Sequence, residues 1–217
     1  MDTGRAKLLK PRKMPVQSRA NVTVQAIFEG SIQVLQREGY SRLTTTRVAE
    51  RAGVSVGTLY QYFPNKQALL AAVLENHLAQ VATAIELACH SQHGHTVREM
   101  VTAAFNAYID IELARLDATH VLNLLPIAEI GGDVLIHATS SRVQQALIAM
   151  LQTARDARFG ESIELEITSL VLATAPIGAM QRMLMQRAGP EPLNALRRHF
   201  IELGVSYLRQ VMITTPD

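Results

Sequence analysis

The chain has 217 residues, of which 48% are hydrophobic and 18% are charged, and its formal net charge is +2. This composition excludes wholesale disorder, and the length permits one large domain or two modest ones. The single cysteine, Cys89, excludes an internal disulfide and fits a reducing compartment. The N-terminus has no apolar signal core, and the most apolar run, Leu170–Met180, is far shorter than the ~20 residues of a membrane span. We therefore expect a cytoplasmic protein with no membrane partner.

The positive charge is concentrated in the first third of the chain. Residues 1–66 contain 11 Lys and Arg against 4 Asp and Glu, a net charge of +7, whereas residues 67–217 contain 10 against 15, a net charge of −5. A basic first third on an acidic body favours a polyanionic partner for that third. A solvated basic tail without a partner is the alternative, and composition alone does not separate the two.

The chain begins with a segment that has no helical pattern and then enters its first helix. Residues 1–17 mix Lys, Arg, Pro and Gly without periodicity, so we interpret them as a flexible basic arm. Apolar residues recur at helical spacing over 18–38, and Gly39 is a typical C-terminal stop. We therefore expect one helix over 18–38.

Two short helices follow, joined by a tight turn. Thr44 is an N-cap for the first of them, and Gly53 closes it. Ser55 caps the second, which extends through Tyr62 and is ended by Pro64. This arrangement predicts a helix-turn-helix, with Gly53 in the left-handed conformation that ends a helix sharply.

Helical periodicity continues after residue 65, and no stretch shows the alternation of a strand. The expected helices cover 66–88, 97–116, a short piece interrupted at Pro126, 133–158, 161–187 with a kink at Pro176, and 192–212. The predicted fold is all-α, with about nine helices: an N-terminal three-helix DNA-binding head with a helix-turn-helix, then a larger helical domain. We expect a flexible basic arm at 1–17, the head at 18–65, and the larger helical domain at 66–217.

The short helix after Gly53 has two chemically different faces. Leu59 and Phe63 lie four residues apart, so both point into a small core. Gly57 removes a side chain and permits close approach to a DNA groove, while tyrosine hydroxyls and Lys66 suit phosphate oxygens. The ordinary alternatives are core tyrosines and a solvated lysine.

Here the sequence resembles a known family. The string "LTTTRVAERAGVSVGTLYQYFPNKQALL", residues 43–70, is similar to the DNA-binding region of the tetracycline-repressor (TetR) family of bacterial transcriptional regulators. The match covers about Val22 to Leu70, and the rest of the chain agrees only in being helical. The resemblance implies a double-stranded DNA operator, a small-molecule effector and no catalytic cofactor.

The resemblance assigns DNA-binding roles to ten positions. Phosphate contacts fall to the start of the second helix, to the two tyrosines and to the start of the fourth helix, and base contacts fall to the exposed face of the third. The residues are Thr44, Thr45, Arg47, Val56, Gly57, Thr58, Tyr60, Gln61, Tyr62 and Lys66. The third helix carries Val56 and Gly57 and no Arg, so direct base readout is sparse and DNA shape gains weight.

The resemblance also implies a homodimer through the last two helices, which predicts a near-palindromic site. Candidate residues for that seam are Leu165, Leu172, Ala175, Met180, Leu184, Leu196, Phe200, Leu203, Tyr207 and Val211. The alternative is that these residues pack in the core of their own subunit. Candidate effector-binding residues in the middle helices are Phe105, Tyr108, Leu122, Leu125, His137 and Met180, with Asp110, Glu112 and His120 as polar anchors. Few charges fall on these helices, so an apolar effector is expected.

Other functions have less support. Cys89, His90, His93 and His95 are metal-ligand types, but their spacing is irregular for a structural zinc site and a solvated loop is expected instead. The sequence has no nucleophile elbow, phosphate-binding loop or His-Glu-x-x-His motif, so we do not expect an enzyme. The leading hypothesis is a ligand-responsive repressor; the alternative is a helical small-molecule-binding protein without sequence-specific DNA binding.

Overall fold

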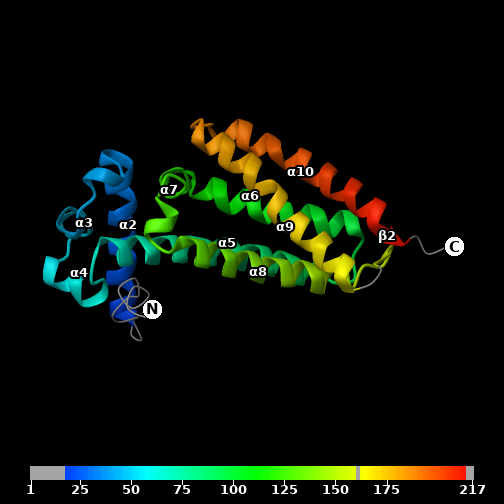
Figure 1. Cartoon of the computed structure of the whole chain (residues 1–217), viewed down its shortest axis with the longest axis horizontal. Coiled ribbons are helices and arrows are strands. Elements are labelled where there is room, and N and C mark those ends of the chain that lie inside the picture. Colours follow the sequence, from blue (N-terminus) through cyan, green and yellow to red (C-terminus); the bar gives the residue numbers. More distant parts are fainter. Residues whose placement is uncertain (1–17, 160–161, 214–217) are drawn as a thin grey trace. The chain divides into compact units, whose positions relative to one another are not determined.

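The structure is a computed structural model of the chain, described for residues 18–159 and 162–213 (Figure 1). Over these residues it contains nine α-helices, labelled α2 to α10, two short 3-10 helices and one pair of two-residue strands. The all-α prediction is therefore confirmed. The basic arm predicted at 1–17 lies outside the described residues.

The chain forms two compact units, and the first contains the helix-turn-helix. It is made of the residues up to His77 together with Asp117–Leu135. Its first elements are α2 (Ser18–Glu38), η1 (Tyr40–Arg42), α3 (Thr45–Ala52) and α4 (Val56–Tyr62), and α3 packs against both α2 and α4 (Figure 1). The side chains that fill this small core include Ile27, Phe28, Val48, Leu59 and Phe63.

Two glycines fix the geometry of the first unit. Gly53 ends α3 with φ 69° and ψ 28°, the left-handed conformation that the sequence predicts. Gly30 allows α2 and α3 to cross closely, because a Cβ at this position would lie 3.1 Å from the backbone nitrogen of Ala52. The pair of helices that carries the turn is thus held by backbone approach as well as by side-chain packing.

Residues 117–135 fold with the first unit although they begin forty positions after His77, where the earlier part of that unit ends. They include most of α7 (Leu116–Leu122) and all of η2 (Ile127–Glu129). Their apolar side chains Leu122, Leu125 and Ile130 are buried. The division expected at 65/66 thus differs from the units of the structure, because α5 (Lys66–Ser91) begins in the first unit and continues into the second.

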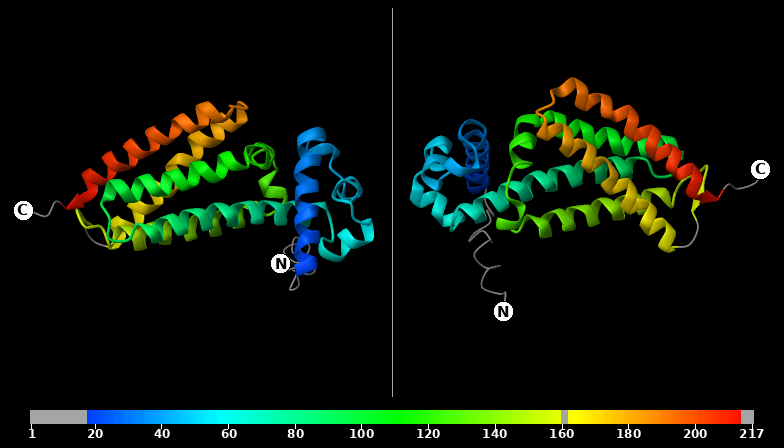
Figure 2. Two further views of the ribbon diagram at one scale, coloured as in Figure 1. Left: turned by 180° about the vertical axis from the view of Figure 1, so that it is seen from behind. Right: turned by 45° about the horizontal axis from the view of Figure 1, so that its top comes forward.

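The second unit is a helical bundle made of Leu78–Leu116 and the residues from Ile136 onward. It contains the rest of α5, α6 (Val97–Ala114), most of α8 (Gly132–Leu151), α9 (Ser162–Met185) and α10 (Pro190–Val211). α10 packs against α6 and α9, as Figure 2 shows from two sides. At this contact the rings of Phe105 and Phe200 lie 5.9 Å apart.

Some predicted boundaries were wrong. α8 ends at Leu151 rather than at 158, because the next residues use their polar groups elsewhere: the Arg155 backbone N–H donates to the His95 carbonyl at 3.1 Å. The expectation of no strand is also wrong, since β1 (Arg158–Phe159) pairs antiparallel with β2 (Met212–Ile213). α9 continues through Pro176.

Two helices are long and apolar enough to cross a membrane by length and composition alone: α5 and residues 164–185 of α9. In the most apolar window of α5, 61% of the residues are buried inside the protein, whereas in α9 only 33% are. α5 is therefore a core helix, and α9 keeps an apolar surface that residues 18–159 and 162–213 leave exposed.

Candidate DNA-binding surface

The helix-turn-helix is built from two capped helices. Thr44, in extended conformation, accepts a hydrogen bond from the backbone N–H of Arg47 at 3.3 Å and so caps α3. Ser55 caps α4 in the same way, accepting from the backbone N–H of Thr58 at 3.0 Å. The hydroxyls of Ser55 and Thr58 also lie 2.8 Å apart, so the Thr58 hydroxyl is already engaged within its own helix.

α4 separates a buried face from an exposed one. Leu59 is fully buried and Phe63 packs its ring 5.8 Å from that of Phe28, which confirms their predicted place in the core. Gly57 and Gln61 are exposed, and Tyr60 is 41% exposed. The other predicted contacts on this helix, Val56, Thr58 and Tyr62, are partly buried.

Tyr60 is held by a residue of the neighbouring helix. The hydroxyls of Tyr60 and Thr45 lie 3.0 Å apart, and either can donate. Thr45 is buried, so its hydroxyl lies below the surface instead of facing a partner directly. This geometry suits a positioning role for Thr45, with the exposed Tyr60 hydroxyl above it available to an acceptor.

Lys66 is engaged by Tyr40, a residue that sequence reasoning missed. Its ammonium donates to the Tyr40 carbonyl at 2.6 Å and lies 3.9 Å from the centroid of the Tyr40 ring. Partial burial lowers the pKa of Lys66, and the charge of Glu129 acts in the opposite direction. The lysine therefore stands at the start of α5 in a defined position rather than as a free solvated chain.

Tyr40 in turn contacts Glu129, 89 residues away in sequence. The Tyr40 hydroxyl donates to Glu129 Oε2 at 2.7 Å, and this bond, together with partial burial and the charge of Glu129, raises the pKa of Tyr40 to about 12. An aromatic residue directly after the stop at Gly39 was a signal that could have identified Tyr40. No local pattern pointed to Glu129.

The arginine of α3 that was predicted to contact phosphate has partners inside the protein. Arg47 forms an ion pair with Glu38 at the end of α2 and donates to the Arg42 carbonyl at 3.0 Å. Arg51 donates to Gln33 in the same way. These contacts tie α3 to α2, and the charge of Arg47 is partly neutralised before any DNA arrives.

Comparison with known protein families gives a match over the helix-turn-helix region. A sequence profile described as bacterial regulatory proteins, tetR family, matches residues 27–73, which include both helices of the helix-turn-helix. The region that carries the helix-turn-helix therefore matches this family of transcriptional regulators. It is 36% identical over 64 residues to the uncharacterized HTH-type transcriptional regulator YvkB of Bacillus subtilis, a match that covers 30% of this chain and 34% of that protein.

A second relative is the HTH-type transcriptional repressor KstR of Mycolicibacterium smegmatis, 38% identical over 55 residues, 25% of this chain and 27% of KstR. The chain thus spans about a third or less of the length of these curated relatives. The fold extends further: a solved TetR-family transcriptional regulator from Mesorhizobium loti superposes with a TM-score of 0.72 at 14% identity, covering 91% of this chain and 100% of that one.

The six predicted effector residues divide between the two units. Leu122 and Leu125 are buried in the first. Phe105 and Met180 are buried in the core of the second, where Tyr108 is partly buried and His137 is exposed. Burial raises the pKa of Tyr108, and the carboxylate of Glu112 adds to the shift.

The proposed polar anchors differ among themselves. Asp110 is exposed and forms an ion pair with Arg197 at 2.6 Å, while Glu112 is buried. His120 has a buried ring nitrogen, Nε2, without a hydrogen-bond partner among the described residues.

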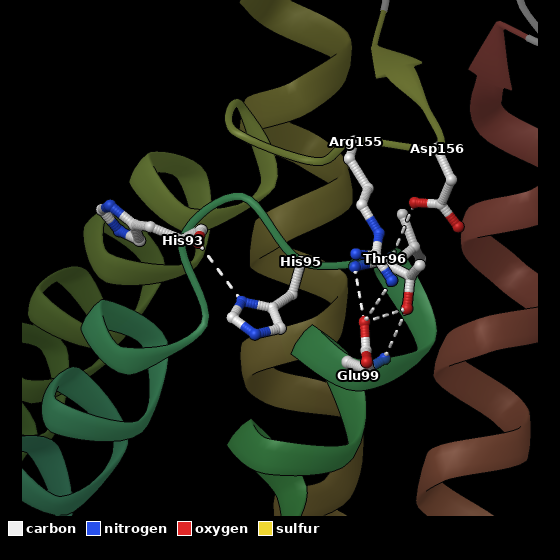
Figure 3. A network of polar contacts seen from close by, with 7 residues as sticks. His93, His95, Thr96, Glu99, Arg155 and Asp156 are labelled. Atoms are coloured by element: carbon white, nitrogen blue, oxygen red, sulfur yellow. Dashed lines mark hydrogen bonds and ion pairs between the residues drawn. The ribbon is translucent and has the colours of Figure 1, made fainter.

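The histidine-rich segment after α5 is part of a helix-capping network (Figure 3). Thr96 and Glu99 form a capping box at the start of α6, Arg155 lies 3.4 Å from Glu99, and Asp156 accepts from the backbone N–H of Val97 at 2.9 Å. The hydrogen bonds from Thr96 lower the pKa of Glu99. Figure 3 shows the His93 ring pointing away from this network. Over residues 18–159 and 162–213, no three His, Cys, Asp or Glu side chains come together as a metal site.

Proposed function

We propose that this TetR-family regulator is a repressor that binds a near-palindromic operator as a homodimer and is released by a small, largely apolar effector. The observation that carries the DNA-binding part is the two-faced α4, whose buried Leu59 anchors a helix that exposes Gly57, Tyr60 and Gln61. Phosphate contacts position such a helix and base contacts give it specificity. DNA binding also places the protein in the cytoplasm.

The homodimer is supported by the uncovered face of α9. Ile167, Leu170, Val171 and Met185 are exposed at helical spacing on one stripe, and Leu203 of α10 is 57% exposed. A two-fold symmetric operator requires two copies of the protein, so we propose that a second copy covers this face. Two apolar helices from each copy would then form a four-helix interface, the seam.

The residues of this seam differ from most of those expected. Leu165, Leu172, Met180, Leu184 and Phe200 are buried in the core of their own subunit, and of the expected ten only Ala175 and Leu203 are exposed. Both faces of α9 are apolar, and packing against α10 in the bundle decides which face turns inward. The seam therefore falls on the opposite face of α9, around Leu170.

One pair of variants tests the homodimer. Ile167→Glu places a charge on the proposed seam at a residue 56% exposed, and Leu87→Glu places the same charge at a 65% exposed position on α5. Ile167→Glu is expected to give monomers in light scattering and to weaken DNA binding by at least tenfold, while Leu87→Glu stays a dimer. Two dimeric variants would mean that the copies meet elsewhere.

The effector is proposed to be largely apolar because four of the six candidate positions are buried hydrophobic residues, Phe105, Leu122, Leu125 and Met180. Protein purified without denaturation and extracted with organic solvent gives any bound molecule for mass spectrometry. The extracted molecule is expected to release the protein from DNA. An extract that contains a tight ligand without effect on DNA would instead support the small-molecule-binding alternative.

The operator itself is tested by selection from a random library of double-stranded DNA. The dimer is expected to enrich one near-palindromic sequence and to protect it in footprinting at moderate salt. Tyr60→Phe should weaken binding to all sequences alike, and Gln61→Ala should relax the choice among them. If no sequence is enriched, the proposed regulatory function is wrong.

A further inference from the structure

Tyr40, Lys66 and Glu129 form a chain of contacts that we name the Tyr40 latch. Glu129 accepts from the Tyr40 hydroxyl at 2.7 Å, and Lys66 donates to the carbonyl of the same tyrosine at 2.6 Å. The Lys66 ammonium also lies over the Tyr40 ring. All three residues belong to the first unit, so the latch joins residues 117–135 to η1 and to the start of α5.

The segment that carries Glu129 is packed against other residues of the first unit. Ile130, next to Glu129, is 1% exposed. Gly132 approaches α5 so closely that a Cβ would lie 2.9 Å from Leu74 Cδ2. The amides of Glu129 and Ile130 are bonded to the carbonyls of Pro126 and Ile127 at 2.9 and 3.3 Å. Their hydrogen exchange therefore reports whether this stretch is closed.

The Lys66 ammonium is in an unfavourable place without these partners. It stands at the N-terminus of α5, where the helix dipole is positive, and it is partly buried. The Tyr40 carbonyl and ring and the negative charge of Glu129 offset that cost. The ammonium has three donors, one of which the carbonyl uses, so donors remain for a phosphate oxygen.

A DNA phosphate bound to Lys66 would therefore act on the same ammonium that the charge of Glu129 stabilises. When phosphate neutralises Lys66, the attraction that holds Glu129 near the head weakens, and the like charges of phosphate and carboxylate repel. Two processes that each affect the other are linked reciprocally, so a change that tightens Glu129 onto Tyr40 lowers DNA affinity by the same factor.

We propose that Tyr40 and Glu129 are positioning residues for Lys66 and that the latch couples DNA binding negatively to the anchoring of residues 117–135. The inference rests on the proposed DNA-binding function. The chain continues from this segment into α6 at one end and α8 at the other. Four of the six candidate effector residues, Phe105, Tyr108, His137 and Met180, belong to the unit that those helices enter. A conformational change caused by an effector in that unit would reach Lys66 through the continuous backbone.

Tyr40→Phe isolates the latch without changing any charge. It keeps the carbonyl and the ring that hold Lys66 and removes only the hydroxyl that Glu129 accepts from. Ser91→Ala removes a hydroxyl of the second unit that donates to the Ala88 carbonyl at 2.8 Å, and it serves as the control. Exchange of the Glu129 and Ile130 amides is measured by mass spectrometry in free protein and in protein saturated with the selected operator DNA.

In the wild type and in Ser91→Ala, DNA is expected to speed exchange at these two amides about tenfold, the effect of losing one hydrogen bond to a charged acceptor. In Tyr40→Phe, exchange should be fast already in the free protein and insensitive to DNA. Exchange that DNA leaves unchanged or slows in the wild type overturns the latch, as does an equal acceleration in Tyr40→Phe. Failure of the wild type to bind any DNA would overturn the proposed function instead, and the latch with it.

Discussion

Thr45→Val tests whether a buried hydroxyl positions Tyr60 for a DNA phosphate. Valine has the shape of threonine, so the buried site stays filled, and only the 3.0 Å contact between the two hydroxyls is lost. The Tyr60 hydroxyl is at the surface and can turn to water, so the free energy of unfolding should change by less than about 1 kcal/mol. The effect is therefore expected in DNA binding rather than in stability.

The size of that effect follows from one neutral hydrogen bond in each head. Such a bond contributes about 0.5–1.5 kcal/mol, so a dimer with two heads should lose about 1–3 kcal/mol, or roughly 5- to 150-fold in affinity. No charge is removed, so the dependence of log K on log salt should keep its slope. Lys66→Ala, which removes a charge from each head, should reduce that slope by about 1.8.

Titration of operator DNA by fluorescence anisotropy at several salt concentrations measures both quantities. Tyr60→Phe removes the hydroxyl that Thr45 positions, so Thr45→Val should have no further effect in a Tyr60→Phe background. Additive losses in the double variant would refute the positioning role. A change of salt slope in Thr45→Val would show that its effect is electrostatic and not local.

Two further predictions concern the second unit. Gly204→Ala should destabilise the protein by about 1–3 kcal/mol in urea unfolding, because the new Cβ would lie 2.8 Å from Phe105 Cε2 and 2.9 Å from Val101 Cγ1. Gly178→Ala, with no atom within 4 Å, is its control and should be neutral or stabilising; equal losses in both would contradict the packing argument. Burial raises the pKa of Cys89 from 9.0 to about 12, so its contribution to stability is complete below pH 9 and declines as the pH rises toward 12. Thiolate absorbance of the folded protein should appear only in that upper range, and ionisation near pH 9 would show that the thiol is not buried.

The elements near the helix-turn-helix were predictable because their signals are local. Thr44 and Ser55 cap helices through their own side chains, and Gly53 adopts the conformation that its missing Cβ permits. Leu59 and Phe63 are four residues apart and necessarily share a face. Each of these inferences needs only a few neighbouring residues, so no knowledge of the tertiary structure is required.

The features that could not be predicted depend on contacts between distant residues. Gly30 looks like a weak helix position until α3 lies against it. Glu129 is an ordinary surface carboxylate until Tyr40, 89 residues earlier, donates to it. Leu165 and Ile167 are equally apolar in sequence, and only packing against the bundle buries the first and leaves the second exposed.

The structure also sharpens the predicted contrast between many phosphate contacts and few base contacts. Thr58 and Gln61 were the two polar side chains assigned to bases, but the Thr58 hydroxyl lies 2.8 Å from Ser55 and serves the helix cap. Gln61 is exposed and keeps its amide for a base edge. Phosphate contacts, by contrast, have Tyr60 positioned by Thr45 and Lys66 positioned by Tyr40. Under the proposed function, such a head would hold the DNA backbone in a defined register and would leave most of the discrimination to Gln61, to the shape of the DNA and to the spacing of two heads in a dimer.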